Sequence, residues 1–178
     1  MKPIRIVPLG RTERAAVETL RDGLASRLRM RVEIAGCPFD LETVFDPTRI
    51  QYNSSRIIQA LEESRCAGEG GRVLGVAAED LYIPILTYVF GEAQLGGDYG
   101  VVSYHRLRNA RYGLPPNPEL EEERLLKEAL HELGHNFGLT HCHLQECVMR
   151  ASTTVDDIDI KGGFYCPECL ARSAYRRA

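Results

Sequence analysis

The chain has 178 residues, of which 44% are hydrophobic and 26% are charged, and its formal net charge is −3. This length and composition are typical of one globular domain, which we expect to cover residues 1–178. The small negative charge gives no general basic surface, so we expect no nucleic-acid partner. No apolar run reaches the roughly 18 residues of a membrane span, so we expect no membrane partner.

The first half of the chain alternates between predicted strands and predicted helices. Hydrophobic patterns predict strands at residues 4–8, 30–34 and 73–77, and helices at residues 12–28 and 54–63. Residues 37–50 carry two prolines and several acidic side chains, so we expect a loop there. Because each crossover helix must cover a sheet, this order predicts an α/β fold with at least some parallel pairing.

The pattern changes after Asp80. Residues 81–90 are apolar with one proline, residues 91–100 are rich in glycine, and residues 101–107 are typical of another strand. No helix fits between these segments, so we expect local antiparallel pairing and therefore a mixed sheet.

A long helix is predicted from Pro118 to about Phe137. Asn117 is a good N-cap, proline is favoured at the first helical position, and Gly138 can adopt the left-handed conformation that ends helices. Residues 139–165 show no strong period, so we expect a loop held by something other than a core. Residues 167–176 are predicted to form a short final helix.

The predicted long helix carries His131, Glu132 and His135. Histidines four residues apart project from one helix face and can bind one metal ion. Gly138 turns the chain, so that His141 can supply a third nitrogen. Three protein ligands leave one position open, which is typical of a catalytic zinc. Glu132 is expected to take a proton from zinc-bound water and pass it to the leaving amine.

Four cysteines follow directly. Cys142 and Cys147 are separated by four residues, and Cys166 and Cys169 by two, which are spacings at which thiolates commonly share a metal ion. Four thiolates would close the site, so its role should be structural. Zinc is favoured, although the spacing also allows iron. The alternatives are two disulfides or buried free thiols.

Three further side chains lie outside these sets. The start of the chain does not resemble an export signal, so we expect a cytoplasmic protein in which Cys37 and Cys66 are buried free thiols. His143 lies beside Cys142 and two residues after His141, so it could replace a ligand in either site. The simpler interpretation is a side chain that faces solvent or supports a ligand.

The two motifs together resemble a known family. The order His-Glu-x-x-His-x-x-Gly-x-x-His, followed by Met149, is similar to the metzincin clan of zinc peptidases. The cysteine after the third histidine and the Cys-Pro-Glu-Cys run at residues 166–169 resemble the archaemetzincins in particular. The resemblance covers residues 131–169 and implies a mixed twisted sheet, a catalytic helix and a C-terminal region stabilised by a second zinc.

By position, the resemblance also implies residue roles. It implies two zinc ions per chain, one catalytic and one structural, and a methionine turn near the first. The implied residues are His131, His135 and His141 as catalytic-zinc ligands, Glu132 as general base, Cys142, Cys147, Cys166 and Cys169 as structural-zinc ligands, and Met149 in the turn.

Two details of the resemblance concern the substrate. Some metzincins have a tyrosine two residues after the methionine, but here that position is Ala151, and Tyr165 is only a remote candidate for an oxyanion stabiliser. In metzincins a substrate peptide pairs with an edge strand above the catalytic helix. Residues 101–105 are the implied counterpart, and an internal strand at this position is equally compatible with the sequence.

We therefore predict a zinc metallopeptidase, either a metalloendopeptidase or aminopeptidase-like, that acts as a monomer on a peptide or protein substrate. The alternative is a peptidase-like zinc protein with little or no hydrolytic activity that binds peptides or proteins. A zinc-ribbon module with a basic tail at Arg172, Arg176 and Arg177 is less favoured, because three arginines are more typical of a solvated chain end.

Overall fold

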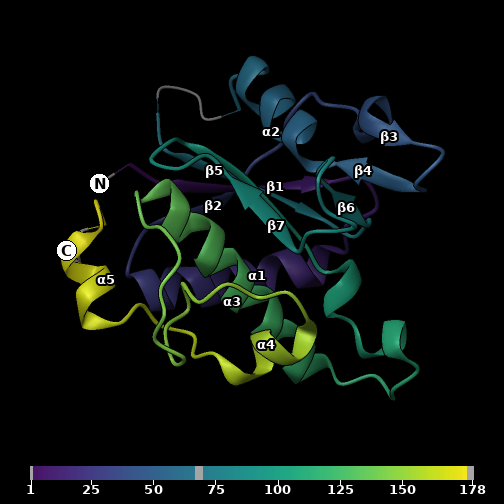
Figure 1. The fold of residues 1–178 in the computed structure, drawn as a ribbon. Coiled ribbons are helices and arrows are strands. Elements are labelled where there is room, and N and C mark those ends of the chain that lie inside the picture. Colours follow the sequence, from purple (N-terminus) through teal and green to yellow (C-terminus); the bar gives the residue numbers. More distant parts are fainter. Residues whose placement is uncertain (1, 67–69, 176–178) are drawn as a thin grey trace.

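The computed structural model describes residues 2–66 and 70–175 and places a five-stranded mixed sheet at the centre (Figure 1). Its strand order is β2–β1–β5–β8–β7. The first four of these strands run parallel to one another, and β7 is antiparallel to β8. The α/β fold and its mixed sheet are thus confirmed. The strands are β1 (Ile4–Leu9), β2 (Val32–Ile34), β5 (Arg72–Ala77), β7 (Gly91–Ala93) and β8 (Tyr99–Ser103).

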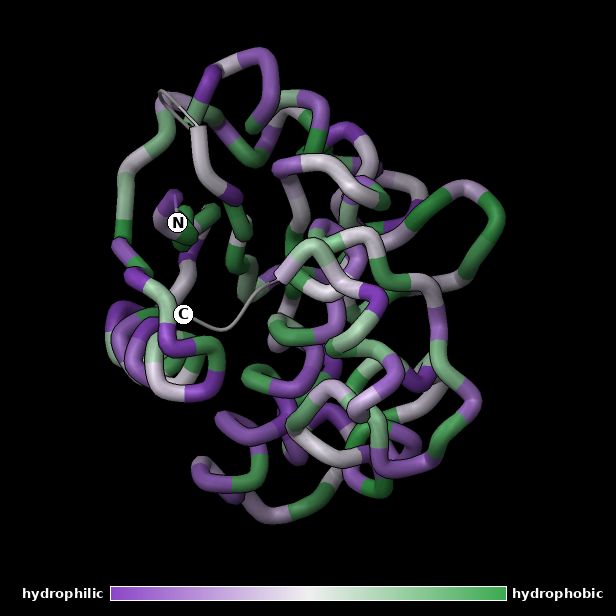
Figure 2. Tube along the Cα trace, turned by 90° about the vertical axis from the view of Figure 1, so that its left-hand side faces the viewer, coloured by the Kyte–Doolittle hydropathy of each residue, from purple (hydrophilic) through white to green (hydrophobic). Residues whose placement is uncertain are grey.

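Helices cover both faces of this sheet. In Figure 1, α1 and α3 lie against one face and α2 lies against the other. Two short helices, α4 and α5, follow α3 in the C-terminal part. The tube in Figure 2 shows hydrophilic and hydrophobic residues following one another along the helices, as expected for elements with one buried side. The helices are α1 (Arg14–Leu28), α2 (Ser54–Glu63), α3 (Pro118–Asn136), α4 (Val155–Ile160) and α5 (Pro167–Arg172).

The sheet separates two hydrophobic cores. Ile6 and Val102 belong to the core beneath α1 and α3, whereas Val7 and Val101 belong to the core beneath α2. Neighbouring strand residues point to opposite faces, so consecutive apolar residues fill both cores. This explains why the central strands are continuously apolar. No described helix has the length and apolar character of a membrane span.

The predicted loop at residues 37–50 contains short regular elements. A 3₁₀-helix at Leu41–Val44 is followed by β3 (Phe45–Asp46). This strand joins β4 (Gln51–Asn53) and β6 (Leu81–Tyr82) in a second, three-stranded sheet. Elements of two to four residues are too short to show a hydrophobic period, so the sequence pattern did not reveal them.

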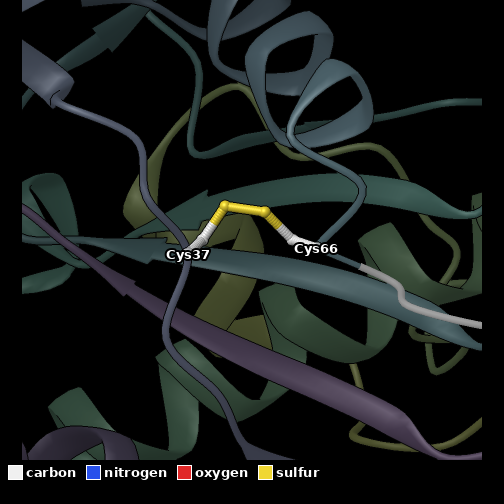
Figure 3. Close-up of a disulfide and its surroundings, with 2 residues drawn as sticks. All are labelled: Cys37 and Cys66. Atoms are coloured by element: carbon white, nitrogen blue, oxygen red, sulfur yellow. A yellow bond between two sulfur atoms is a disulfide. The ribbon is translucent and has the colours of Figure 1, made fainter.

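Cys37 and Cys66 form a disulfide, with Cα atoms 5.6 Å apart (Figure 3). The prediction of two buried free thiols is therefore wrong. Both side chains are only partly buried and pack against the core beneath α2. The bridge joins the segment after β2 to the end of α2, two segments that are distant in sequence and brought together by the sheet.

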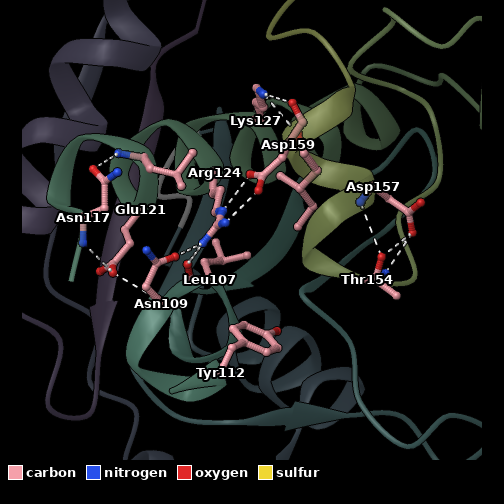
Figure 4. A network of polar contacts seen from close by, with 12 residues as sticks. Leu107, Asn109, Tyr112, Asn117, Glu121, Arg124, Lys127, Thr154, Asp157 and Asp159 are labelled. Carbon is pink, nitrogen blue, oxygen red and sulfur yellow. Dashed lines mark hydrogen bonds and ion pairs between the residues drawn. The ribbon is translucent and has the colours of Figure 1, made fainter. Parts of the chain in front are cut away.

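The predicted loop at residues 139–165 also contains a helix, α4. Thr154 caps it, because its hydroxyl accepts a hydrogen bond from the backbone N–H of Asp157, and the Asp157 carboxylate accepts one from the N–H of Thr154 (Figure 4). Backbone hydrogen bonds from Thr153 and Thr154 lower the pKa of Asp157 to about 2. The signal for this helix is its capping box. Of the arginines in the proposed basic tail, Arg176 and Arg177 lie outside the described residues.

Candidate active site and metal centres

Helix α3 begins and ends as its sequence predicts. The Asn117 side chain accepts a hydrogen bond from the N–H of Leu120 at 3.2 Å, and Pro118 opens the helix. After the last turn, Gly138 has a φ of +86°, which a residue with a side chain rarely adopts. These two ends fix the length of α3, and therefore where the chain turns back with His141.

Two histidines of the motif lie on one side of α3. The Nε2 atoms of His131 and His135 are 3.2 Å apart. Each ring has its Nδ1 atom 2.8 Å from a backbone carbonyl oxygen, that of Val148 for His131 and that of Leu139 for His135. These contacts favour a proton on Nδ1, which leaves the Nε2 lone pairs free to bind a metal ion.

His141 returns towards the same point. Its ring centroid lies 5.3 Å from that of His131 and 5.1 Å from that of His135. One ligand atom from each of the three histidines lies within 4.8 Å of the other two. Three converging nitrogens fit zinc and leave one position open for another ligand.

The electrostatic surroundings favour neutral histidines. Burial lowers the pKa of all three imidazoles, and the positive charge of Lys161 lowers each of them further. Only a neutral imidazole can bind a metal ion. The triad is therefore in its metal-binding form at neutral pH.

Glu132 lies beside the triad and is only 4% exposed. Burial, and then the nearby Glu128 carboxylate, raise its pKa well above the usual value of 4.5. Its side chain packs directly on the backbone of β7, because a Cβ atom built on Gly91 would lie 2.6 Å from Glu132 Oε1. Glycine at position 91 therefore leaves the space that the Glu132 carboxylate occupies.

A cleft of about 620 Å³ opens above these residues. Helix α3 forms one side of it with Glu128, His131, Glu132 and His135. The segment from residue 86 through β7 forms the opposite side, and residues 151–153 close a third. The triad and Glu132 thus face a space that is large enough for a peptide segment.

β7 is the edge strand of the main sheet that borders this cleft. Of the two interpretations of residues 101–105, the internal strand is correct, because β8 pairs with β5 on one side and with β7 on the other. The edge position implied by the resemblance is occupied by β7 instead. The sequence did not indicate this strand, because β7 is only three residues long and lies in a segment whose glycines suggested a turn.

A buried ion pair lies next to the cleft. Lys161 Nζ is 2.6 Å from Glu128 Oε1 and donates a hydrogen bond to the carbonyl oxygen of Arg150 at 3.2 Å. Lys161 is 1% exposed and Glu128 is 3% exposed. The pair ties the segment after Met149 to α3, the helix that carries His131 and His135. No sequence pattern indicates this pair, since its members are 33 positions apart in the chain.

Further polar contacts fix α4 against α3 (Figure 4). Arg124 donates to both carboxylate oxygens of Asp159 at 2.7 Å. Lys127 donates to the carbonyl oxygens of Ile158 and Asp159. The third wall of the cleft is thereby anchored to the helix that carries the metal ligands.

Met149 is fully buried behind the triad. A Cβ atom on Gly134 would overlap its sulfur, so the methionine packs directly on the backbone of α3 between the two helical histidines. Its carbonyl oxygen accepts a hydrogen bond from the backbone N–H of Cys142 at 2.9 Å. The turn itself is closed by the N–H of Arg150 donating to the carbonyl oxygen of Cys147.

Neither position considered for an oxyanion stabiliser supplies one. Ala151 lines the cleft and has no polar side chain. Tyr165 is buried away from the cleft, and its hydroxyl donates to the carbonyl oxygen of Leu130 at 2.6 Å.

The four cysteines of the second motif also converge. The sulfur atoms of Cys142 and Cys166 are 4.0 Å apart, and those of Cys147 and Cys169 are 3.7 Å apart. All four sulfurs lie within 4.8 Å of one another. Burial raises the pKa of the Cys147 and Cys169 thiols, so a bound cation is needed to hold them as thiolates. The set fits a closed tetrahedral zinc site better than two disulfides.

His143 belongs to neither group of converging ligands among the described residues. Its side chain is exposed, and its backbone carbonyl accepts a hydrogen bond from Arg150 Nη1 at 3.1 Å. The simpler of the two interpretations, a solvent-facing side chain, therefore describes it.

Comparisons with known proteins agree with the motifs. The model of peptidase family M54 matches residues 17–174. The archaemetzincin of Pyrococcus furiosus is 37% identical over 174 residues, which cover 95% of this chain and 91% of the relative. That of Methanocaldococcus jannaschii is 43% identical over 125 residues, which cover 70% of this chain and 67% of the relative.

Solved structures show the same likeness. The crystal structure of archaemetzincin from Archaeoglobus fulgidus, complexed with malonate, superposes with a TM-score of 0.82 at 36% identity, covering 95% of this chain and 98% of the other. A zinc-dependent peptidase from Methanocorpusculum labreanum gives a TM-score of 0.84 at 29% identity, covering 94% and 98%. Family model, relatives and structures agree, and the chain belongs to peptidase family M54, the archaemetzincins.

Proposed function

We propose that this protein hydrolyses peptide bonds with a catalytic zinc held by His131, His135 and His141, and with Glu132 as general base. The observation that carries the proposal is the position of the buried Glu132 carboxylate, which lies beside three converging nitrogens and faces a cleft. When bound, zinc supplies Lewis acidity, which makes water more acidic and polarises a peptide carbonyl.

The residues of the chain then have separate tasks. Glu132 accepts a proton from the attacking water as its oxygen bonds to the carbonyl carbon, and delivers that proton to the amine nitrogen as the C–N bond breaks. Its raised pKa suits both steps, because such a carboxylate accepts a proton more readily and holds it until the amine leaves. The carbonyls of Val148 and Leu139 keep two of the imidazoles oriented.

The substrate is proposed to bind as an additional strand beside β7. An unpaired strand edge offers backbone donors and acceptors to any extended peptide, and this edge borders the cleft above Glu132. A peptide bound there would place a backbone carbonyl near the triad. This geometry is compatible with a metalloendopeptidase and with an aminopeptidase-like enzyme.

We propose a purely structural role for a second zinc at Cys142, Cys147, Cys166 and Cys169. Four sulfurs leave no open position for a substrate. The segment between the two cysteine pairs carries Met149 and one wall of the cleft. A zinc at this site would therefore support the active site through the backbone, giving two zinc ions per chain.

The remaining expectations stay predictions. They are a monomeric state, a cytoplasmic location and the absence of nucleic-acid and membrane partners. A peptide or protein substrate is the partner that the cleft supports.

The proposal is tested with Glu132→Gln, which keeps the shape of the side chain but removes its basicity. We expect the variant to retain the zinc content of the parent while cleavage of a diverse peptide library falls at least about a hundredfold. Cleavage at the parent rate would contradict the role of Glu132. A parent protein that binds peptides tightly but cleaves none of them would favour the alternative, a peptide-binding zinc protein.

A further inference from the structure

Glu92 occupies the centre of the free edge strand. It pairs with Val101 of β8, whereas its neighbour Gly91 pairs with Val102. Val101 belongs to the core beneath α2, so Glu92 lies on the α2 face of the sheet, opposite to the face on which Gly91 approaches Glu132. Glu92 thus lies on the other side of β7 from the Glu132 carboxylate, and the residue is part of the cleft lining.

Two serines at the start of α2 hold this carboxylate. Ser55 Oγ lies 2.8 Å from Glu92 Oε1 and 3.0 Å from Glu92 Oε2, and it donates a hydrogen bond to this carboxylate. Ser54 Oγ donates a second hydrogen bond to Oε2. Ser54 is itself fully buried. The carboxylate is therefore fixed in position, so the Glu92 side chain loses little conformational entropy when a binding partner contacts it.

The charge of Glu92 is not neutralised within the protein. No described lysine or arginine forms an ion pair with it, and the described residues that line the cleft include no lysine or arginine. The other two carboxylates of the cleft are already accounted for, since Glu128 is paired with Lys161 and Glu132 is the proposed base. Glu92 is thus the carboxylate that remains available to a substrate.

We propose that Glu92 is a specificity-determining residue that binds a cationic nitrogen of the substrate, either a lysine or arginine side chain or a free α-amino group. The inference rests on the proposed function, because it assumes that a peptide pairs with β7. In such a pair the residue opposite Glu92 lies on the same face, with Cβ atoms ~4.5–5.5 Å apart. A cation there is attracted, and an acidic residue is repelled.

The inference is tested by peptide binding to zinc-loaded Glu132→Gln protein, so that no hydrolysis interferes. One peptide set is blocked at both ends and carries lysine, norleucine or glutamate at each position in turn. A second set contains only the lysine-free sequences, each prepared once with a free N-terminus and once with an acetylated N-terminus. Dissociation constants are measured at low and high salt, with and without Glu92→Gln. Glu63→Gln, which removes an exposed carboxylate at the end of α2, is the matched control.

We expect the peptide with lysine to bind about fivefold more tightly than the peptide with norleucine at one position, or at alternate positions whose side chains share a face. This preference should weaken in high salt. Glu92→Gln should abolish this preference and leave the norleucine peptides unchanged, whereas Glu63→Gln should preserve it. If only peptides with a free N-terminus show the Glu92-dependent preference, the bound group is the α-amino group.

Equal affinity of lysine, norleucine and free-amine peptides for both proteins would overturn the inference. So would an equal loss of affinity for every peptide in Glu92→Gln, since that would indicate a structural role. Cleavage of the same peptides by protein with an intact Glu132 separates this result from the proposed function. Selective binding without any cleavage would refute the peptidase and leave the cation subsite standing.

Discussion

The backbone N–H of Cys142 donates a hydrogen bond to the carbonyl oxygen of Met149, at 2.9 Å. This contact joins the two candidate metal sites. Cys142 follows His141 directly, and Met149 packs behind the other two histidines. Cys147, two residues before Met149, belongs to the cysteine group. Loss of a metal ion from the sulfurs should therefore alter the backbone that positions the histidine site.

The first prediction concerns this coupling. Replacing Cys166 and Cys169 with serine should remove the cysteine-site zinc and free the backbone around Met149. We expect the affinity of the histidine site for zinc to fall by about tenfold to a hundredfold, because His141 is no longer held in place. Titration against a competing chelator measures this affinity. Cys66→Ser, which breaks the distant disulfide, should leave it unchanged. Unaltered affinity in the double variant would show that the sites are independent.

The second prediction concerns the space that Gly91 leaves for Glu132. Gly91→Ala places a methyl group 2.6 Å from Glu132 Oε1 and 2.7 Å from the carbonyl oxygen of Val101, so the carboxylate and the β7 backbone must both shift. We expect kcat to fall by about tenfold to a hundredfold with the zinc content unchanged, because small displacements of a catalytic group have large effects. Gly36→Ala is the control, since a Cβ atom there meets no other atom within 4 Å. An active Gly91→Ala enzyme would mean that Glu132 is not held against β7.

The third prediction concerns the buried pair of Lys161 and Glu128. Lys161→Met leaves the Glu128 carboxylate buried without its partner, which should lower the free energy of unfolding by about 3–5 kcal/mol. Adding Glu128→Gln to this variant should recover most of the loss, because the unpaired charge is gone. Denaturant unfolding of the single and double variants measures both effects. Additive losses would show that the two residues act separately.

The fourth prediction concerns pH. Burial lowers the pKa of His131, His135 and His141 below 6.5, so the imidazoles stay neutral to lower pH than a free histidine. With a lowered pKa, protons compete with zinc for the imidazole nitrogens only at acidic pH. The zinc affinity of the histidine site should therefore be nearly constant from about pH 8 to 6.5 and decline below that range. Chelator competition across this range provides the measurement. A decline already present between pH 8 and 7 would contradict the assigned environment.

The features that the sequence predicted are those with local causes. The Asn117 cap, the end at Gly138 and the four-residue spacing of His131 and His135 each act within one or two helical turns, so the pattern itself indicated them. The spacing of the cysteine pairs is similarly local. It indicated that the four sulfurs share one metal site, and the structure brings them together in a group separate from the histidines.

The features that the sequence missed depend on contacts across the fold. β7 is a strand only because β8 pairs with it, and its glycines suggested a turn. The bond between Cys37 and Cys66 depends on how the segments after β2 and α2 meet. The pairing of Lys161 with Glu128 depends on the position of α4 over α3. None of these leaves a periodic signal in the chain.

Zinc analysis of purified protein tests the two-site arrangement most directly. The parent protein should contain two zinc atoms per chain, and His135→Ala should contain one, retained at the cysteines, with no peptide hydrolysis. One zinc atom in the parent protein, or full hydrolysis by His135→Ala, would contradict the assignment of a catalytic zinc to the histidine triad.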